Sequence, residues 1–258
     1  MNPNSFRARV RSRERLLGTF IKTPAYQVVE VLASAGPDFA LIDAEHAPFD
    51  RMTLDAAVLA ARASQLPALI RIADSQPSTI LHALDIGATG IVAPHMRTPE
   101  EVIHTYAATR YRAGERSGRG FSNSPRAGGY GKLGMAELIP EADRNAVLIC
   151  QIEDKEAVEN IEQIAALDDI DCLFIGKADL AVSYGLIDGS LEQREQLDRI
   201  VETVCRACNA AHRAIGIFLP NLDELARYEV MGVSLFVIGS DQALLKTQMS
   251  AIAAGFRK

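Results

Sequence analysis

The chain has 258 residues, enough for one large α/β domain or two small ones. Hydrophobic residues make up 48% and charged residues 23%, the balance of an ordinary globular protein with a sizeable core. The formal net charge of -6 argues against a nucleic-acid-binding surface, and no apolar run is long enough to cross a bilayer.

Eight short apolar segments alternate with helical patterns along the chain. They are rich in Val, Ile, Leu and Phe without polar alternation, as in parallel strands that are buried on both faces. The strand candidates are Leu16–Ile21, Asp38–Asp43, Ala68–Ile72, Gly90–Ala93, Ala146–Gln151, Asp171–Ile175, Ala214–Leu219 and Ser234–Ile238.

The segments between these strands carry helix signals. Thr98, Pro99 and Glu101 have the pattern of a capping box with Pro at the first helical position, and Gly87 suits a helix C-cap. Apolar residues at helical spacing mark one face of the helix after the fifth strand (Val158, Ile161 and Ala165) and of the last helix (Leu245, Met249, Ile252 and Phe256).

Eight strand–helix units in about 250 residues is the count of a (β/α)8 TIM barrel. A doubly wound open sheet has the same local pattern and is the alternative. We predict a single TIM-barrel domain over residues 1–258, with a leading helix over Ser5–Leu16 that caps the bottom of the barrel. No linker or longer repeat divides the chain.

Residues 111–134 interrupt the alternation with a long segment rich in Gly and Arg. Such a segment is a surface loop, a lid or a contact with a neighbouring subunit. Elsewhere, Cys205 and Cys208 have the spacing of half a zinc site. No second pair completes it, so we expect both thiols in the core. The N-terminus lacks the apolar part of a secretory signal, which predicts a cytoplasmic protein with reduced cysteines.

Polar residues gather where the predicted strands end, which is the end of a TIM barrel that carries the chemistry. They are Asp43, Glu45 and His46, then Arg71, His95, Gln151 and Glu153, Lys177 and Asp179, Asn221, and Ser240 and Asp241.

Glu153 and Asp179 follow adjacent strands and offer hard oxygen ligands. Two carboxylates with water and substrate oxygens make an octahedral site for Mg, Mn or a similar divalent cation. Gln151 points to the same side of its strand as Glu153 and can bond to substrate or to metal-bound water. Helix N-capping is the alternative for both carboxylates.

His46 is the candidate for proton transfer, because an imidazole titrates near neutral pH. Asp43 or Asp85 could orient its ring. Arg71 interrupts an apolar strand and can stabilise negative charge on a substrate oxygen. For His95, a packing role at the end of its strand and a catalytic role both stay open.

These residues stand in motifs that resemble the HpcH/HpaI aldolase family, whose members are metal-dependent class II aldolases of pyruvate and related 2-oxo acids. The similarity runs over nearly the whole chain. The motifs are Leu41–Pro48 (LIDAEHAP), Arg71, Gln151–Glu153 (QIE) and Phe174–Leu180 (FIGKADL).

The resemblance implies roles for individual residues. Glu153 and Asp179 would ligate the divalent metal (Mg, Mn or Co), and Gln151 with the backbone at Ala178 and Asp179 would seat the carboxylate of the substrate. Arg71 would stabilise the enolate, and His46, supported by Asp85, would move the proton.

The reaction implied is the addition of a pyruvate or hydroxypyruvate enolate to an aldehyde, or the cleavage of a 4-hydroxy-2-oxo acid in reverse, with oxaloacetate decarboxylation as a side reaction. Family members form hexamers, trimers of dimers that exchange the C-terminal helix. The acceptor aldehyde, the donor and the physiological metal stay open.

Two departures from the family pattern stand out. Lys177 occupies the position where the family has Pro, and the segment Glu115–Gly118 before Arg119 is expanded. Lys177 raises the alternative of a Schiff-base aldolase without metal. A lyase acting on a CoA thioester and a non-catalytic barrel used for binding or assembly are the further alternatives.

Overall fold

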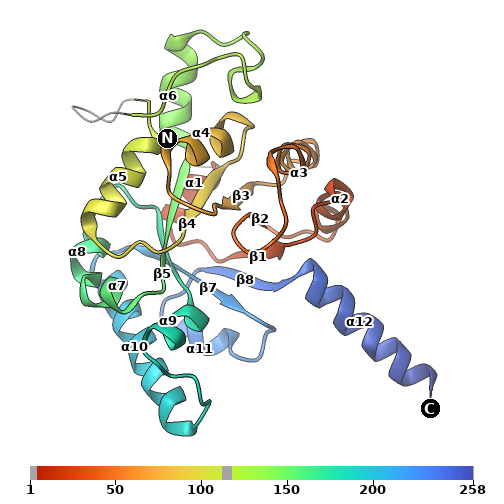
Figure 1. Ribbon diagram of the computed structural model, residues 1–258, viewed down its shortest axis with the longest axis vertical. Helices are drawn as coiled ribbons and strands as arrows, with labels where there is room; N and C mark the ends of the chain where they lie inside the picture. Colours follow the sequence, from red (N-terminus) through yellow and green to blue (C-terminus); the bar gives the residue numbers. More distant parts are fainter. Residues whose placement is uncertain (1–4, 112–117, 258) are drawn as a thin grey trace.

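The computed structural model describes residues 5–111 and 118–257, and these form one closed barrel of eight parallel strands in sequential order. Helices surround the barrel, and the C-terminal helix α12 projects away from it (Figure 1). The TIM barrel predicted from the sequence is therefore confirmed as the fold, and the alternative prediction of an open, doubly wound sheet is wrong.

All eight strands lie within two residues of the predicted bounds at either end. They are β1 (Leu16–Ile21), β2 (Phe39–Asp43), β3 (Ala68–Arg71), β4 (Gly90–Ala93), β5 (Val147–Ile152), β6 (Cys172–Ile175), β7 (Ala214–Leu219) and β8 (Leu235–Ser240). The helices are α1 (Phe6–Arg11), α2 (Tyr26–Ser34), α3 (Arg51–Ala63), α4 (Pro77–Asp85), α5 (Pro99–Thr109), α6 (Met135–Asn145), α7 (Lys155–Glu159), α8 (Ile161–Ala165), α9 (Lys177–Ser183), α10 (Leu191–Ala210), α11 (Leu225–Val230) and α12 (Asp241–Phe256), with a 3-10 turn η1 (Arg126–Gly128).

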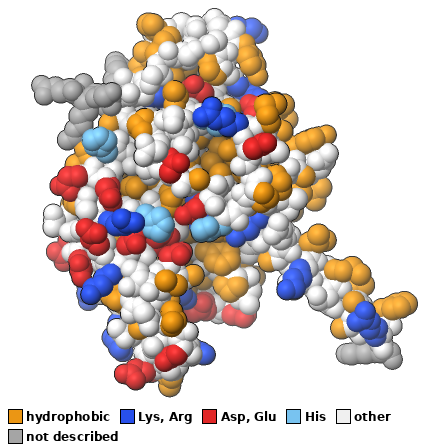
Figure 2. All heavy atoms as spheres, in the orientation of Figure 1, with side chains coloured by type: hydrophobic (Ala, Val, Ile, Leu, Met, Phe, Trp, Pro, Cys, Tyr) orange, Lys and Arg blue, Asp and Glu red, His pale blue; other side chains and the backbone are white. Residues whose placement is uncertain are grey.

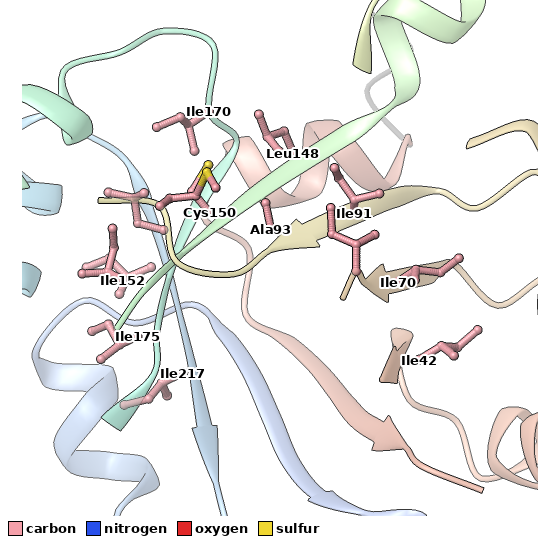
Figure 3. Close-up of a cluster of buried hydrophobic side chains, with 14 of the residues drawn as sticks. Ile42, Ile70, Ile91, Ala93, Leu148, Cys150, Ile152, Ile170, Ile175 and Ile217 are labelled. Carbon is pink, nitrogen blue, oxygen red and sulfur yellow. The ribbon is translucent and has the colours of Figure 1, made fainter. Parts of the chain in front are cut away.

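The apolar strands are buried on both faces because one hydrophobic core fills the inside of the barrel and a second lies between the barrel and the surrounding helices. On β5, Val147 and Ile149 point into the barrel, whereas Leu148, Cys150 and Ile152 pack under the helices. Figure 3 shows the outer core, in which an isoleucine from each of several neighbouring strands joins one cluster. The alternation places Gln151 on the inward side, as the sequence predicts.

The N-terminal helix closes the bottom of the barrel. Phe6 and Val10 of α1 join the interior cluster, and the Phe6 ring lies 5.5 Å from the ring of Phe39. Arg7 donates to the buried carboxylate of Asp171 at 2.8 Å, which fastens α1 to the start of β6. The capping role is confirmed, although the helix ends at Arg11, short of the predicted Leu16, because β1 begins there.

Other local predictions are also confirmed. The Thr98 side chain accepts from the backbone N–H of Glu101, which completes the capping box of α5, and Gly87 has a φ of +93° just after α4. Cys205 and Cys208 are buried in the outer core, where burial raises the pKa of each thiol to about 12. Their structural role is therefore confirmed.

The last helix differs from expectation. Its predicted apolar face is not buried against the barrel, because Leu245, Met249, Ile252 and Phe256 are between 54% and 90% exposed. The helix contacts β1 and β8 near its start and then extends outward (Figure 1). None of the described helices is both long and apolar enough to span a membrane.

Of the interrupting segment the structure describes Tyr111 and residues 118–134, in which η1 packs against α4. Arg126 of η1 binds the carboxylate of Asp55 at 2.8 Å and the carbonyl oxygen of Ile86 at 2.7 Å. These contacts do not place it across the strand ends of its own barrel as a lid. The predicted expansion at Glu115–Gly118 lies mostly outside the described residues.

Candidate active site at the mouth of the barrel

The carboxyl ends of the strands bring charged side chains together at the mouth of the barrel. Histidine side chains lie beside clustered Asp and Glu side chains on the face drawn in Figure 2. Asp43, Arg71, Gln151 and Glu153 are all buried there. Four of the residues predicted from strand ends therefore share one site.

Arg71 is fixed by two carboxylates. Its Nε and Nη2 donate to the two oxygens of Asp43 at 3.0 and 2.8 Å, and its Nε also lies 3.2 Å from Glu45. The guanidinium stacks over the ring of Phe20 at 4.7 Å. Burial opposes ionisation of Asp43, but Arg71 outweighs it and lowers the pKa of that carboxyl below its usual range.

Glu153 is a buried carboxylate whose hydrogen bonds, within the described residues, come from two amide groups. The backbone N–H of His95 donates to its Oε1 at 2.8 Å, and the side-chain amide of Gln151 donates to its Oε2. Burial raises the pKa of Glu153 to about 7, against the effect of His95, and the charges of Asp179 and Glu45 add to the rise. An oxyanion in this position favours a cation beside it.

The chain leaves room for this carboxylate at Gly176. A Cβ built at that position would lie 2.8 Å from both Cβ and Oε2 of Glu153, which is too close for any side chain. Glycine at the end of β6 is therefore required by the close approach of the two strands. The Glu153 side chain occupies the space, and it does not cap α7, which excludes the capping alternative for Glu153.

Asp179 lies in the first turn of α9, close enough for its charge to raise the pKa of Glu153. The cap position of α9 is Gly176, so Asp179 is not the N-cap. The N–H groups of Ala178 and Asp179 precede the first bond within the helix, from Leu180 to Gly176, and they are free to bind an anion.

His46 is half-exposed beside the site. Its ring Nε2 lies 3.7 Å from Glu45, and its backbone N–H donates to Asp43. Within the described residues neither Asp43 nor Asp85 contacts the ring, so the predicted orientation of His46 by either carboxylate does not form in one chain. Asp85 lies in the last turn of α4, where it pairs with Arg119.

The Lys177 side chain points away from the predicted metal site. Its ammonium lies 3.2 Å from Glu224 and 5.0 Å from the ring centre of Tyr228, on the side of α11. Burial disfavours the charged amine, but Tyr228 and Glu224 outweigh it and raise the pKa of Lys177. A lysine held as an ammonium is a poor nucleophile, which counts against the Schiff-base alternative.

Two other strand-end groups have structural partners. The Asp241 carboxylate accepts hydrogen bonds from the backbone N–H groups of Lys22 and Thr23 at 2.8 and 3.0 Å. The Asn221 side chain accepts one from the N–H of Asp223 in a turn. These bonds join β8 to the end of β1 and shape the loop after β7, so neither residue is needed to explain the site.

The structure brings together three residues, Glu45, His95 and Asp154, to which the sequence assigned no metal-binding role. Ligand atoms of Glu45, His95 and Glu153 all lie within 4.8 Å of one another, and His95 Nδ1 lies 2.9 Å from Asp154. Asp179 does not belong to this group, although it stands beside Glu153. Glu45 and His95 were already among the polar residues predicted at the strand ends. Asp154 was missed, although it too follows a strand end within three residues, which is the signal that could have found it.

This arrangement fits a divalent cation. The carboxylates of Glu45 and Asp179 each lie close enough to Glu153 to raise its pKa, and the buried guanidinium of Arg71 is already bound by Asp43. Gln151 Oε1 and Glu45 Oε2 are buried and accept no hydrogen bond. Oxygen donors with excess negative charge are what Mg, Mn and similar ions bind.

Known proteins share both sequence and fold with this chain. The profile of the HpcH/HpaI aldolase/citrate lyase family matches residues 16–247. The 5-keto-4-deoxy-D-glucarate aldolase of Enterobacter sp. (strain 638) is 28% identical over 256 residues, which cover 99% of this chain and 98% of that protein.

Solved structures agree. An HpcH/HpaI aldolase/citrate lyase family protein from Burkholderia cenocepacia J2315 superposes with a TM-score of 0.91 at 30% identity, and covers 98% of both chains. The citrate synthase SbnG superposes with a TM-score of 0.84 at 27% identity, over 98% of this chain and 97% of its own.

Proposed function

Because the chain belongs to the HpcH/HpaI aldolase/citrate lyase family, we propose that this aldehyde-lyase uses a divalent metal to join a pyruvate or hydroxypyruvate enolate to an aldehyde. In reverse it cleaves a 4-hydroxy-2-oxo acid. The observation that carries the proposal is the buried carboxylate of Glu153, which pairs with no Lys or Arg among the described residues, at the same barrel mouth as the anchored guanidinium of Arg71.

Glu153 and Asp179 would hold the metal, which supplies a Lewis acid for the keto and carboxylate oxygens of the substrate. Gln151 supports this role because it holds Glu153 through one hydrogen of its amide and has a second to offer to a substrate carboxylate. The free N–H groups of Ala178 and Asp179 offer further donors to the same carboxylate.

Arg71 is placed to stabilise the enolate oxygen. Asp43 binds Nε and Nη2, which fixes the plane of the guanidinium and leaves Nη1 without a partner among the described residues. A donor that is already oriented costs no reorganisation when charge develops on the substrate. His46, exposed at the rim, is the proposed base that removes the proton from the methyl carbon of pyruvate.

The proposed role of Asp85 requires a second copy of the chain, since within one chain Asp85 is paired with Arg119 and does not contact His46. The exposed apolar face of α12 supports such an assembly, because an unpartnered face of four large apolar residues is typical of an interface. We propose a hexamer built from dimers that exchange α12. Light scattering on the full chain tests this, and a monomer would contradict it.

The substrate class follows from the relatives. A 5-keto-4-deoxy sugar acid, numbered from its keto end, is a 4-hydroxy-2-oxo acid, which is the class proposed for this chain. The acceptor would then be an aldehyde that carries hydroxyl or carboxylate groups. The cytoplasm is the proposed location, supported by four cysteines that are free thiols.

Exchange of the methyl protons of pyruvate for deuterium, followed by NMR, tests the proposal. We expect exchange with Mg, Mn or Co, none after chelation, and recovery when metal is returned. A panel of aldehydes then identifies the acceptor from the product. Exchange that continues at full rate in the chelated protein would contradict the metal-dependent mechanism.

A further inference from the structure

His95 follows β4 and stands over the carboxylates of the mouth. Its Nδ1 lies 2.9 Å from Asp154 and 3.5 Å from Glu153, and its Nε2 lies 3.9 Å from Glu45. The ring therefore contacts three carboxylates that come from the ends of two different strands. The proposed function assigns it no role.

The backbone holds His95 in this place. Its φ of +53° lies in the left-handed region, which few residues other than glycine adopt. The N–H of His95 donates to Glu153, and the N–H of Met96 donates to the carbonyl oxygen of Gln151 at 3.3 Å. An unfavourable backbone conformation fixed by two bonds to one neighbouring strand is typical of functional positions.

Asp154 determines which nitrogen of the ring is available. An ionised carboxylate only accepts, so the hydrogen of the 2.9 Å bond stands on Nδ1, and the lone pair of a neutral ring stands on Nε2. Arg97 Nε lies 3.3 Å from the same Asp154 oxygen and steadies it. A carboxylate behind a histidine, with the far nitrogen free, is the arrangement that orients metal-binding histidines.

The spacing of the donor atoms suits one ion. Atoms that are each about 2.1 Å from an octahedral ion lie about 3.0 Å apart when adjacent and about 4.2 Å apart when opposite. The 3.9 Å between His95 Nε2 and Glu45 lies within this range, and the 4.8 Å limit of the group lies somewhat beyond it. Because the His95 side chain is 47% exposed, a small rotation of its ring can bring the donors onto a common ion.

We propose that His95 is a ligand of the divalent metal through Nε2, beside Glu153, with Asp154 as the carboxylate that orients it. This inference rests on the metal-dependent function proposed above and deepens it. A site of oxygens alone suits Mg, Ca and Mn, whereas an imidazole favours Zn, Fe, Ni and Cu. His95 therefore shifts the metal preference of this chain toward later transition metals.

Pulsed EPR of the full chain loaded with Mn²⁺ tests the bond directly, because a coordinated imidazole nitrogen gives a characteristic ¹⁴N coupling to the ion. We expect the coupling in the wild-type protein and its loss in His95→Phe. His104→Phe is the matched control, since His104 is an exposed histidine of α5. It should keep the coupling unchanged.

Metal titration of the metal-free protein gives a second measurement. His95→Phe should weaken Co²⁺ binding at least ~10-fold while Mg²⁺ binding changes less than ~3-fold. Asp154→Asn keeps the imidazole but removes the group that orients it, and it should weaken Co²⁺ binding by about 10- to 100-fold. This variant serves as the test if His95→Phe does not fold.

The outcomes separate this inference from the proposed function. Stoichiometric Mn²⁺ binding without ¹⁴N coupling, or coupling that persists in His95→Phe, would overturn the role of His95 and leave the metal-dependent aldolase intact. Pyruvate exchange that needs no metal, in a protein that binds none, would overturn both.

Discussion

At the bottom of the barrel, the buried carboxylate of Asp171 is bound by Arg7 at 2.8 Å, by Arg11 at 3.0 Å and by the backbone N–H of Leu148. At the mouth, the equally buried carboxylate of Glu153 receives hydrogen bonds from two amide groups and lies beside other carboxylates. The His95 ring lies 3.5 Å away, but among the described residues no Lys or Arg pairs with Glu153. Both carboxylates belong to β5 and β6 or their immediate ends, and their surroundings are opposite.

This contrast separates structure from function in one fold. A buried charge with its own counterions fastens two parts of the chain, as Asp171 fastens α1 to the barrel. A buried charge without them lowers stability, and a chain tolerates it where a ligand supplies the missing cation. Changes at the two ends should therefore affect different measurements.

The largest expected effect is that of Glu153→Gln on activity. Removal of a proposed metal ligand should lower metal-dependent pyruvate exchange by about 10³-fold or more, since a metal contributes several kcal/mol to the transition state. The deuterium-exchange rate at saturating Mn²⁺ measures this. Glu156→Gln, on the exposed side of α7, is the control, and equal rates in both variants would contradict the assignment.

The same variant should change stability with pH in the metal-free protein. Burial raises the pKa of Glu153 to about 7, so the folded state holds this proton more tightly than the unfolded state does. Stability is then lost as the pH rises from about 4.5 to about 7. Urea unfolding should show metal-free Glu153→Gln more stable than wild type at pH 8 and equal to it at pH 4.

At the bottom the expected effect is on folding alone. Asp171→Asn leaves Arg7 buried without its counterion and should lower the free energy of unfolding by about 3–5 kcal/mol. Asp168→Asn removes a fully exposed carboxylate at the same end and should leave the free energy of unfolding nearly unchanged. Activity per folded molecule should stay unchanged in both variants. A loss of activity in either would contradict the purely structural role assigned to the bottom of the barrel.

The smallest effect is expected at Lys177. Its ammonium binds Glu224 rather than the carboxylates of the site, so Lys177→Met should change the exchange rate less than about 3-fold. Borohydride treatment in the presence of pyruvate should leave the wild-type lysine unlabelled. A covalent adduct at Lys177 would replace the metal mechanism by the Schiff-base one.

Much of the site could be predicted from the sequence because it depends on local order. The pleat places Gln151 and Glu153 on the same side, and the ends of parallel strands meet at one mouth, so polar residues after β2, β3 and β5 had to come together. The orientation of His46 by Asp43 or Asp85 stays a prediction, for the opposite reason. Asp85 is separated from it by the length of α4, and which charges pair across helices is not a local property.

The amino-acid sequence by itself determined the barrel, its strands and the sites of Arg71, Gln151 and Glu153, because strand periodicity and chain order fix them. Only the tertiary structure decided where charge was balanced. It paired Asp171 with two arginines and Lys177 with Glu224, gave Glu153 no Lys or Arg partner among the described residues, and brought His95 beside Glu153. These outcomes depend on distances between segments that are far apart in the chain, and those distances exist only after the barrel has closed.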